Sequence, residues 1–153
     1  MSNRADPDDG GGGGIACTKG ASPNIVDVTF FQNRAGSGGG LFCVFGSSPV
    51  MTRANFIENT ARTGGGVYVE DDCAPTFSDC SFDRNLGDLA GGGVLNGGVT
   101  RFDRCTFCGN RAAQGACLWL GYFSNTRTSN SILAFGQRDR PSPASEAISW
   151  KLG

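Results

Sequence analysis

The chain contains no histidine, and this absence excludes several classes of enzyme at once. Histidine is the commonest general base and metal ligand, so neither a Ser-His-Asp nor a Cys-His catalytic group can form within the chain. Basic side chains are also few, since 13 lysines and arginines against 14 acidic residues give a net charge of −1. Such a chain has no basic field to neutralise phosphates, and we expect no nucleic-acid partner.

Long apolar runs are absent as well. No stretch approaches the roughly 18 apolar residues of a membrane-spanning helix, so we expect no membrane span. Residues 1–9, MSNRADPDD, have no apolar centre and do not form a secretory signal. The chain is therefore either cytoplasmic or a mature part of a longer exported protein.

The chain does contain a repeat of about 26 residues, which two short motifs carry. One motif is Phe-x-x-Asn, and the other is a glycine triplet followed by an apolar residue. The Phe-x-x-Asn copies begin at Phe30, Phe56, Phe82 and Phe107, and the triplets begin at Gly12, Gly38, Gly64 and Gly91. A fixed period of this length predicts an architecture of stacked repeats.

Each repeat alternates apolar and polar residues in short runs that turn residues separate. In the third copy, for example, Phe77 and Phe82 point inward on two successive runs. The pattern predicts three short strands per repeat and an all-β, parallel β-solenoid of about six coils. We expect a single domain over 1–153, with an N-terminal extension (1–10), regular coils (11–136) and a loop plus last strand (137–153).

The segment Asp79-Cys80-Ser81-Phe82-Asp83-Arg84-Asn85, followed by Gly91–Gly93 and Val94, resembles a known repeat. It is similar to the Gly-Gly-Ala and Phe-x-x-Asn repeats of chlamydial polymorphic outer-membrane proteins and related bacterial surface proteins. These belong among the right-handed parallel β-helix proteins of the pectate-lyase-like superfamily. The resemblance covers residues 10–150 and implies a right-handed β-helix outside the cell or on its surface. That superfamily includes lyases, hydrolases, adhesins and tailspikes, so the activity stays open.

Two columns of aligned residues are interpreted as structural. The asparagines of the first motif predict a ladder of amide hydrogen bonds through the stack. At the bend of each coil the charge alternates, so that neighbours about 4.8 Å apart would pair and would fix the register. An acid and arginine catalytic site is the alternative for this second column. The members are Asn33, Asn59, Asn85 and Asn110 for the asparagine ladder, and Asp27, Arg53, Asp79 and Arg104 for the charge ladder.

Outward positions after the glycine triplets carry Phe42, Tyr68 and Trp119. An exposed apolar face usually marks a binding surface. One interpretation is that this face packs against a neighbouring subunit or the C-terminal tail, and the other is that sugar rings stack on it. The acidic loop Glu70-Asp71-Asp72 lies just beyond, and its oxygens could bind Ca²⁺ or could simply be solvated.

The resembling lyases combine Ca²⁺ with a lysine or arginine base near this sheet. The only lysines here are Lys19 and Lys151, one near each end of the chain. Among the arginines, Arg101 and Arg127 match no known motif. The resemblance therefore supplies no catalytic residues, and we expect no cofactor other than a possible Ca²⁺.

The seven cysteines are an odd number, so at least one is unpaired or pairs between chains. Cys17 and Cys43 are expected to be inward neighbours in adjacent coils, and so are Cys80 and Cys105. Such neighbours lie within reach of a disulfide, but buried thiols would pack equally well.

Neither end of the predicted solenoid carries an evident cap. An open coil edge exposes unpaired backbone groups, which a further coil can cover. We therefore expect a non-enzymatic structural or adhesive protein whose copies associate end to end and can form filaments. The residues expected at these ends are Ile15, Cys17, Ile148 and Trp150. The alternative is an acidic-polysaccharide lyase or glycan-binding module, with polysaccharide as the partner.

Overall fold

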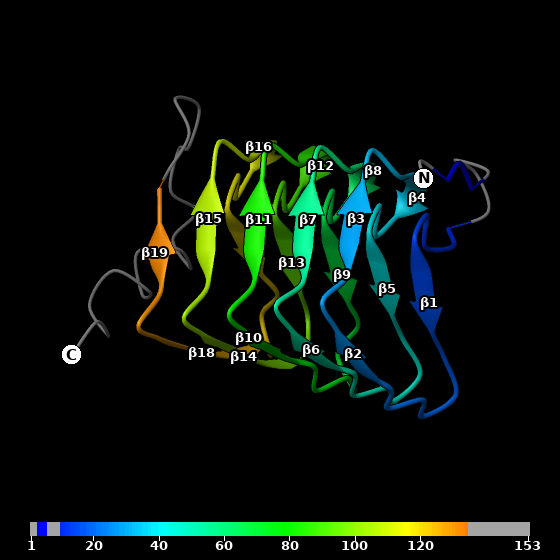
Figure 1. The fold of residues 1–153 in the computed structure, drawn as a ribbon. Coiled ribbons are helices and arrows are strands. Elements are labelled where there is room, and N and C mark those ends of the chain that lie inside the picture. The colour runs from blue at the N-terminus through cyan, green and yellow to red at the C-terminus, as the bar shows by residue number, and fades with distance from the viewer. Residues whose placement is uncertain (1–2, 6–9, 135–153) are drawn as a thin grey trace.

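The computed structural model describes residues 3–5 and 10–134, which wind into about five turns of a parallel β-solenoid (Figure 1). The first sheet contains β1 (Ile15–Cys17), β5 (Leu41–Cys43), β9 (Val67–Val69), β13 (Val94–Asn96) and β17 (Leu118–Leu120). The second contains β2 (Asn24–Val26), β6 (Val50–Thr52), β10 (Thr76–Ser78), β14 (Val99–Asp103) and β18 (Asn125–Ser129). The third contains β3 (Thr29–Phe31), β7 (Asn55–Ile57), β11 (Ser81–Asp83), β15 (Thr106–Cys108) and β19 (Ile132–Leu133). The fourth contains β4 (Arg34–Ser37), β8 (Thr60–Thr63), β12 (Leu86–Ala90) and β16 (Arg111–Gln114).

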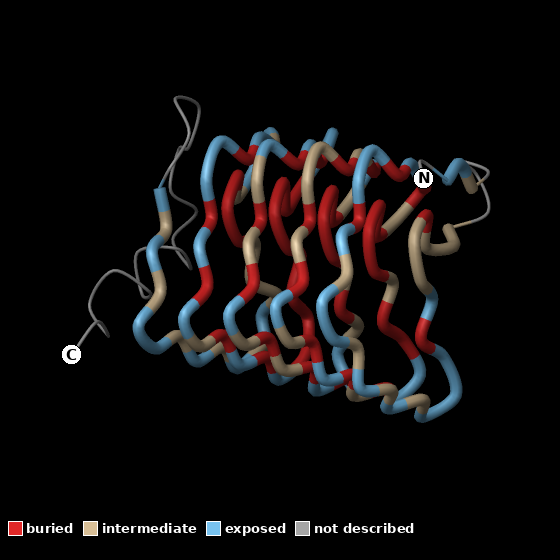
Figure 2. Tube along the Cα trace, in the orientation of Figure 1, coloured by how far each residue is buried: buried red, intermediate tan, exposed pale blue. Residues whose placement is uncertain are grey.

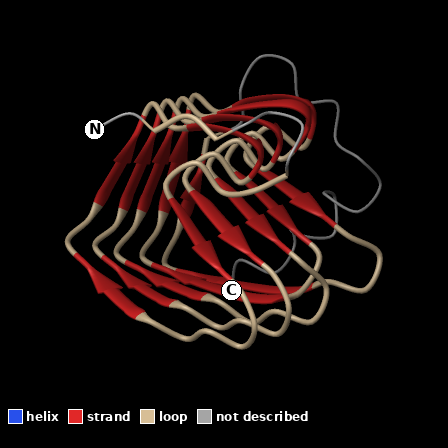
Figure 3. Cartoon of the chain, turned by 90° about the vertical axis from the view of Figure 1, so that its right-hand side faces the viewer, coloured by secondary structure: helices blue, strands red, loops and turns tan. Residues whose placement is uncertain are grey.

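The predicted fold class is confirmed, but the first four coils each have four strands where three were expected. The additional strands form the fourth sheet, directly after each Phe-x-x-Asn motif (Figure 3). We expected a turn to begin at the asparagine. The side-chain oxygen of each asparagine instead accepts the backbone N–H of the asparagine one coil earlier, and the backbone then continues as a new strand. The last of the six expected coils falls at residues 146–148, which lie outside the described residues.

Phenylalanine columns fill the interior of the stack. Phe56, Phe82 and Phe107 are fully buried, and their rings stack with centroids 4.9 and 4.4 Å apart. A second column on the second sheet, Phe77 and Phe102, meets the first edge to face. Figure 2 shows the buried positions lying along the inner side of every coil. The β-solenoid therefore has a continuous core that passes from one coil to the next.

The four asparagines of the motif form an unbroken ladder beside these rings. In each step, the amide of one asparagine donates to the side-chain oxygen of the next, at 2.9 Å from Asn33 to Asn59 and 3.0 Å from Asn59 to Asn85. The backbone N–H of the same donating asparagine also donates to this oxygen, from Asn33 to Asn59 and from Asn59 to Asn85. The amide of Asn85 also donates to the carbonyl of Phe56 at 2.8 Å. Buried amides are thus paired along the ladder, as their burial requires.

The fourth sheet contains one irregularity. β12 has five residues, whereas β4, β8 and β16 have four, and the pairing register shifts between Gly87 and Ala90. Gly87 and Ala90 stay buried, so the extra residue is accommodated by Asp88 and Leu89, which are both exposed. Such a β-bulge redirects side chains on the outer face without disturbing the core.

Candidate functional site

The structure brings two of the three predicted outward aromatics together. Phe42 and Tyr68 lie in register on β5 and β9, and their half-buried rings stack with centroids 5.3 Å apart. Trp119 lies two coils beyond Tyr68, and Leu95 stands between them. The outward face of the first sheet is therefore an apolar stripe, with an aromatic pair at one end and a tryptophan at the other.

The turns between the first and second sheets carry exposed aromatic residues that sequence reasoning missed. Phe45 is 64% exposed and has a φ of 54°. Tyr122 and Phe123, in the corresponding turn three coils later, are 96% and 83% exposed. Lys19, at the equivalent position one coil earlier, has a φ of 56°, so the left-handed conformation belongs to this turn of the repeat. The sequence did contain a signal for this turn, because Phe45-Gly46 aligns with the turn residues Lys19-Gly20 one coil earlier.

The acidic loop Glu70-Asp71-Asp72 lies in the same column of turns, one coil after Phe45. Glu70 accepts a hydrogen bond from the backbone N–H of Phe45 at 2.8 Å, and Asp71 and Asp72 are exposed. Among residues 3–5 and 10–134, no group of three or more suitable side chains is arranged to hold a metal ion. The three carboxylates therefore do not make the predicted Ca²⁺ site in this structure. Burial, together with Glu70 and Asp71, raises the pKa of the Tyr68 phenol.

The predicted charge ladder consists of two separate ion pairs. Arg53 binds Asp27 at 2.6 Å and Arg104 binds Asp79 at 2.7 Å, each through two hydrogen bonds. These hydrogen bonds lower the pKa of both aspartates. Arg53 makes no ion pair with Asp79. All four residues have a φ between 51° and 56°, so the backbone of each coil bends through the left-handed region at this column. A catalytic role for these residues would have to be compatible with that bend.

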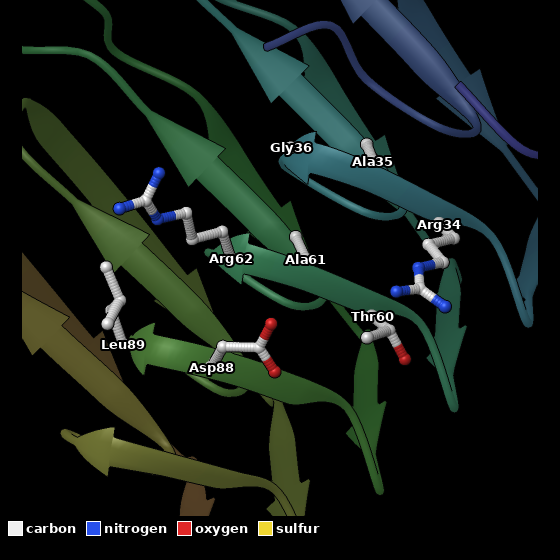
Figure 4. Close-up of a pocket in the computed structure, with 8 residues that line it drawn as sticks. All are labelled: Arg34, Ala35, Gly36, Thr60, Ala61, Arg62, Asp88 and Leu89. Atoms are coloured by element: carbon white, nitrogen blue, oxygen red, sulfur yellow. The ribbon is translucent and has the colours of Figure 1, made fainter. Parts of the chain in front are cut away.

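A shallow hollow lies on the outer face of the fourth sheet (Figure 4). Its volume is about 230 Å³, and its lining includes Arg34 from β4, Arg62 from β8, and Asp88 and Leu89 from the bulge of β12. Neither arginine forms an ion pair with any described residue, whereas Arg53, Arg84 and Arg104 all do. The sequence signal for this hollow was the spacing from Gly64 to Gly91, one residue longer than between the earlier triplets.

Six of the seven cysteines are buried, and Cys108 is exposed. Cys17 and Cys43 lie in register, as expected, and the thiols of Cys80 and Cys105 donate to the backbone carbonyls of Met51 and Phe77. Burial raises the pKa of the Cys43 thiol, and interaction with the Cys80 thiol raises the pKa of Cys105, whereas the same interaction lowers the pKa of Cys80. Cys43 and Cys105 are thus held as neutral packing groups in the core.

At the N-terminal end, residues 3–5 continue the fourth sheet. Arg4 pairs in parallel with Arg34, and the N–H of Asn3 donates to the side-chain oxygen of Asn33 at 2.9 Å. Asn3 therefore takes the same place in the ladder as the four predicted asparagines. Ile15 and Cys17 lie on β1, the outermost strand of the first sheet, as predicted. Ile148 and Trp150 lie outside the described residues.

The described residues contain no helix with the length and hydropathy needed to cross a membrane. Four parallel sheets around one stacked core define the chain as a parallel β-solenoid. A family model described as the right-handed beta helix region matches residues 6–133, so the chain belongs to the right-handed β-helix family. No curated protein and no solved structure matches the chain in the corresponding comparisons.

Proposed function

We propose that the protein is a non-enzymatic structural or adhesive β-solenoid whose copies stack end to end. The observation that carries this proposal is the segment at residues 3–5, which pairs with β4 through an isolated β-bridge between Arg4 and Arg34. Arg34 uses its N–H and C=O to bond Asn3 and Ala5. In a parallel ladder, the N–H and C=O of Arg4 therefore point away from Arg34, toward the next strand position.

The outward side of this segment matches what a further coil needs. No described residue bonds the N–H or C=O of Arg4, and none donates to the side-chain oxygen of Asn3. Each asparagine oxygen within the ladder accepts such donors from the coil before it. Another coil can thus add in register, and we propose that a second copy supplies it. Because this contact joins unlike ends, its repetition gives a filament. The resemblance to bacterial surface proteins favours a location on or outside the cell.

Electron microscopy and light scattering over a concentration series test this proposal. We expect filaments of coil width, with the strand repeat of about 4.8 Å along the axis. A wild-type protein that stays monomeric at the highest concentration would contradict end-to-end stacking.

Two substitutions at one position isolate the backbone contact. Arg4→Pro removes the outward N–H but keeps both hydrogen bonds to Arg34, since Asn3 and Ala5 make them. Arg4→Ala removes the same side chain and keeps the N–H. We expect Arg4→Pro to abolish filaments and Arg4→Ala to leave them. Equal filament formation by the two variants would exclude this edge as the contact.

A second candidate function is glycan binding on the first sheet. The stacked, half-exposed rings of Phe42 and Tyr68 favour it, because sugar rings pack on such surfaces. A panel of neutral and acidic polysaccharides, with and without Ca²⁺, tests this function by binding and by release of unsaturated product. Binding that is lost in Phe42→Ala supports a glycan-binding module, and new ultraviolet absorbance from the products supports a lyase.

A further inference from the structure

We propose that two copies also associate side by side, with the turn formed by Phe45 and Glu70–Asp72 of one copy entering the Arg34/Arg62 hollow of the other. The first of these surfaces is called the acidic knob below, and the second the hollow. The contact is lateral and does not depend on end-to-end stacking. It uses one surface on each side that the fold leaves without a partner of opposite charge.

The hollow has the properties of a binding site for carboxylates. Arg34 and Arg62 line it from neighbouring strands, and neither forms an ion pair with a described residue. Figure 4 shows their side chains on either side of the small residues Ala35 and Ala61. The volume of about 230 Å³ is of the order of one large side chain. Leu89, which is 49% exposed, supplies an apolar contact at the rim.

The acidic knob has the complementary composition. Asp71 and Asp72 are exposed and make no ion pair with a described residue. The hydrogen bond from the Phe45 N–H to Glu70 holds an exposed aromatic ring beside these charges.

The two surfaces have apolar groups that can contact each other, as well as opposite charges. An aromatic anchor beside charged groups is the usual composition of a binding hot spot, and Phe45 would meet Leu89 while the aspartates meet the arginines. Asp88 is the one carboxylate in the hollow, and it opposes the incoming acids. Removing its charge should therefore tighten the contact, which is the opposite of the effect of removing Arg34 or Arg62.

The experiment is sedimentation velocity of the full chain at ionic strengths of about 0.01 M and 1 M, between which the Debye length falls from roughly 30 to 3 Å. We expect lateral association at low salt only, whereas filament formation through backbone hydrogen bonds persists at high salt. Failure of end-to-end stacking would thus remove the salt-resistant species and leave the salt-sensitive one.

Charge reversal identifies the residues. The hollow-reversed variant carries Arg34→Glu and Arg62→Glu, and the knob-reversed variant carries Asp71→Lys and Asp72→Lys. We expect each alone to lose the salt-sensitive species, and an equimolar mixture of the two to regain it. Asp88→Asn should shift the wild-type association to lower protein concentration.

A matched control excludes attraction by net charge. Arg101→Glu with Arg127→Glu changes the net charge as much as hollow reversal does, at two exposed arginines of the second sheet. This variant should associate like the wild type, and it should also form the salt-sensitive species with the knob-reversed variant, whose hollow is intact. If it fails to associate, or if hollow reversal leaves association unchanged, the proposal is wrong. Binding of a polyuronate that hollow reversal abolishes, with no association of the protein itself, would identify a glycan as the occupant and also overturn it.

Discussion

The interior columns of this solenoid repeat the same residue from coil to coil, whereas the turn columns carry different residues. In the interior, the position of Phe56 is occupied by phenylalanine in four successive coils, and the position of Asn59 by asparagine. In the turns between the first and second sheets, successive coils carry unlike residues, which include Phe45, Asp71 and Tyr122. The interior must repeat because each side chain packs on its own copy one coil away, whereas the turns face solvent and are free to differ.

The inserted residue in β12 shows how sharply the two regions are separated. The asparagine ladder continues past the bulge without interruption, from Asn85 to Asn110 at 2.9 Å. The displaced residues, Asp88 and Leu89, are both on the outside. A departure from the repeat that leaves the interior intact can be selected for what it does on the surface. This is why the hollow is the better guide to function than the regular columns.

The largest expected difference between the two regions is in the cost of removing a side chain. Phe82 is fully buried between Phe56 and Phe107, so Phe82→Ala should lower the free energy of unfolding by about 3–5 kcal/mol. Leu89→Ala, on the exposed bulge, should change it by less than about 0.5 kcal/mol. Urea unfolding followed by circular dichroism measures both. Similar losses in the two variants would mean that the core is not the stacked column described here.

Breaking the ladder should cost somewhat less. Asn85→Ala leaves the buried N–H of Asn59 and the side-chain amide of Asn59 without the oxygen that accepts from both, and each unpaired group costs about 1–3 kcal/mol. We expect a total loss of about 2–4 kcal/mol in urea unfolding. The matched control is Asn55→Ala, which removes only a part-buried hydrogen bond to Ser81. A loss no larger than that of the control would show that the ladder contributes little to stability.

The reactivity of the cysteines tests the same difference between interior and exposed positions. In the native protein, iodoacetamide near pH 8 should modify Cys108 quickly and the six buried thiols slowly. Burial raises the pKa of Cys43, for example, so that its reactive thiolate is scarce below the raised value. Mass spectrometry should find one fast adduct, which Cys108→Ser removes. Fast modification of several cysteines would indicate that the coils open readily.

The sequence predicted the regions that repeat. The spacing of Phe56 and Asn59 was enough to give the fold class, the core and the ladder, because stacked coils place equivalent residues in contact. The fourth sheet was missed because an asparagine usually starts a turn, and only the hydrogen bonds of its side chain show that the chain extends beyond it. Asn3 was missed since it lies 30 residues before Asn33, outside the regular period.

The candidate sites were harder to predict, because they depend on departures from the period. Whether Arg34 and Arg62 have acidic neighbours depends on how four sheets close around the core, and no local pattern contains that information. The acidic loop was recognised, but its residues make one hydrogen bond to Phe45 and do not converge on a metal position. End-to-end association and glycan binding stay predictions.

The smallest expected effect on stability, and the one that separates stability from function most directly, belongs to Phe45. Asparagine tolerates the left-handed region better than phenylalanine, so Phe45→Asn should raise the free energy of unfolding slightly, by up to about 1 kcal/mol. The backbone N–H that binds Glu70 is retained. If the exposed ring serves the lateral contact, the same variant should associate more weakly at low salt while unfolding at higher urea concentration. A variant that is both more stable and equally associated would show that the acidic knob does not need its aromatic residue.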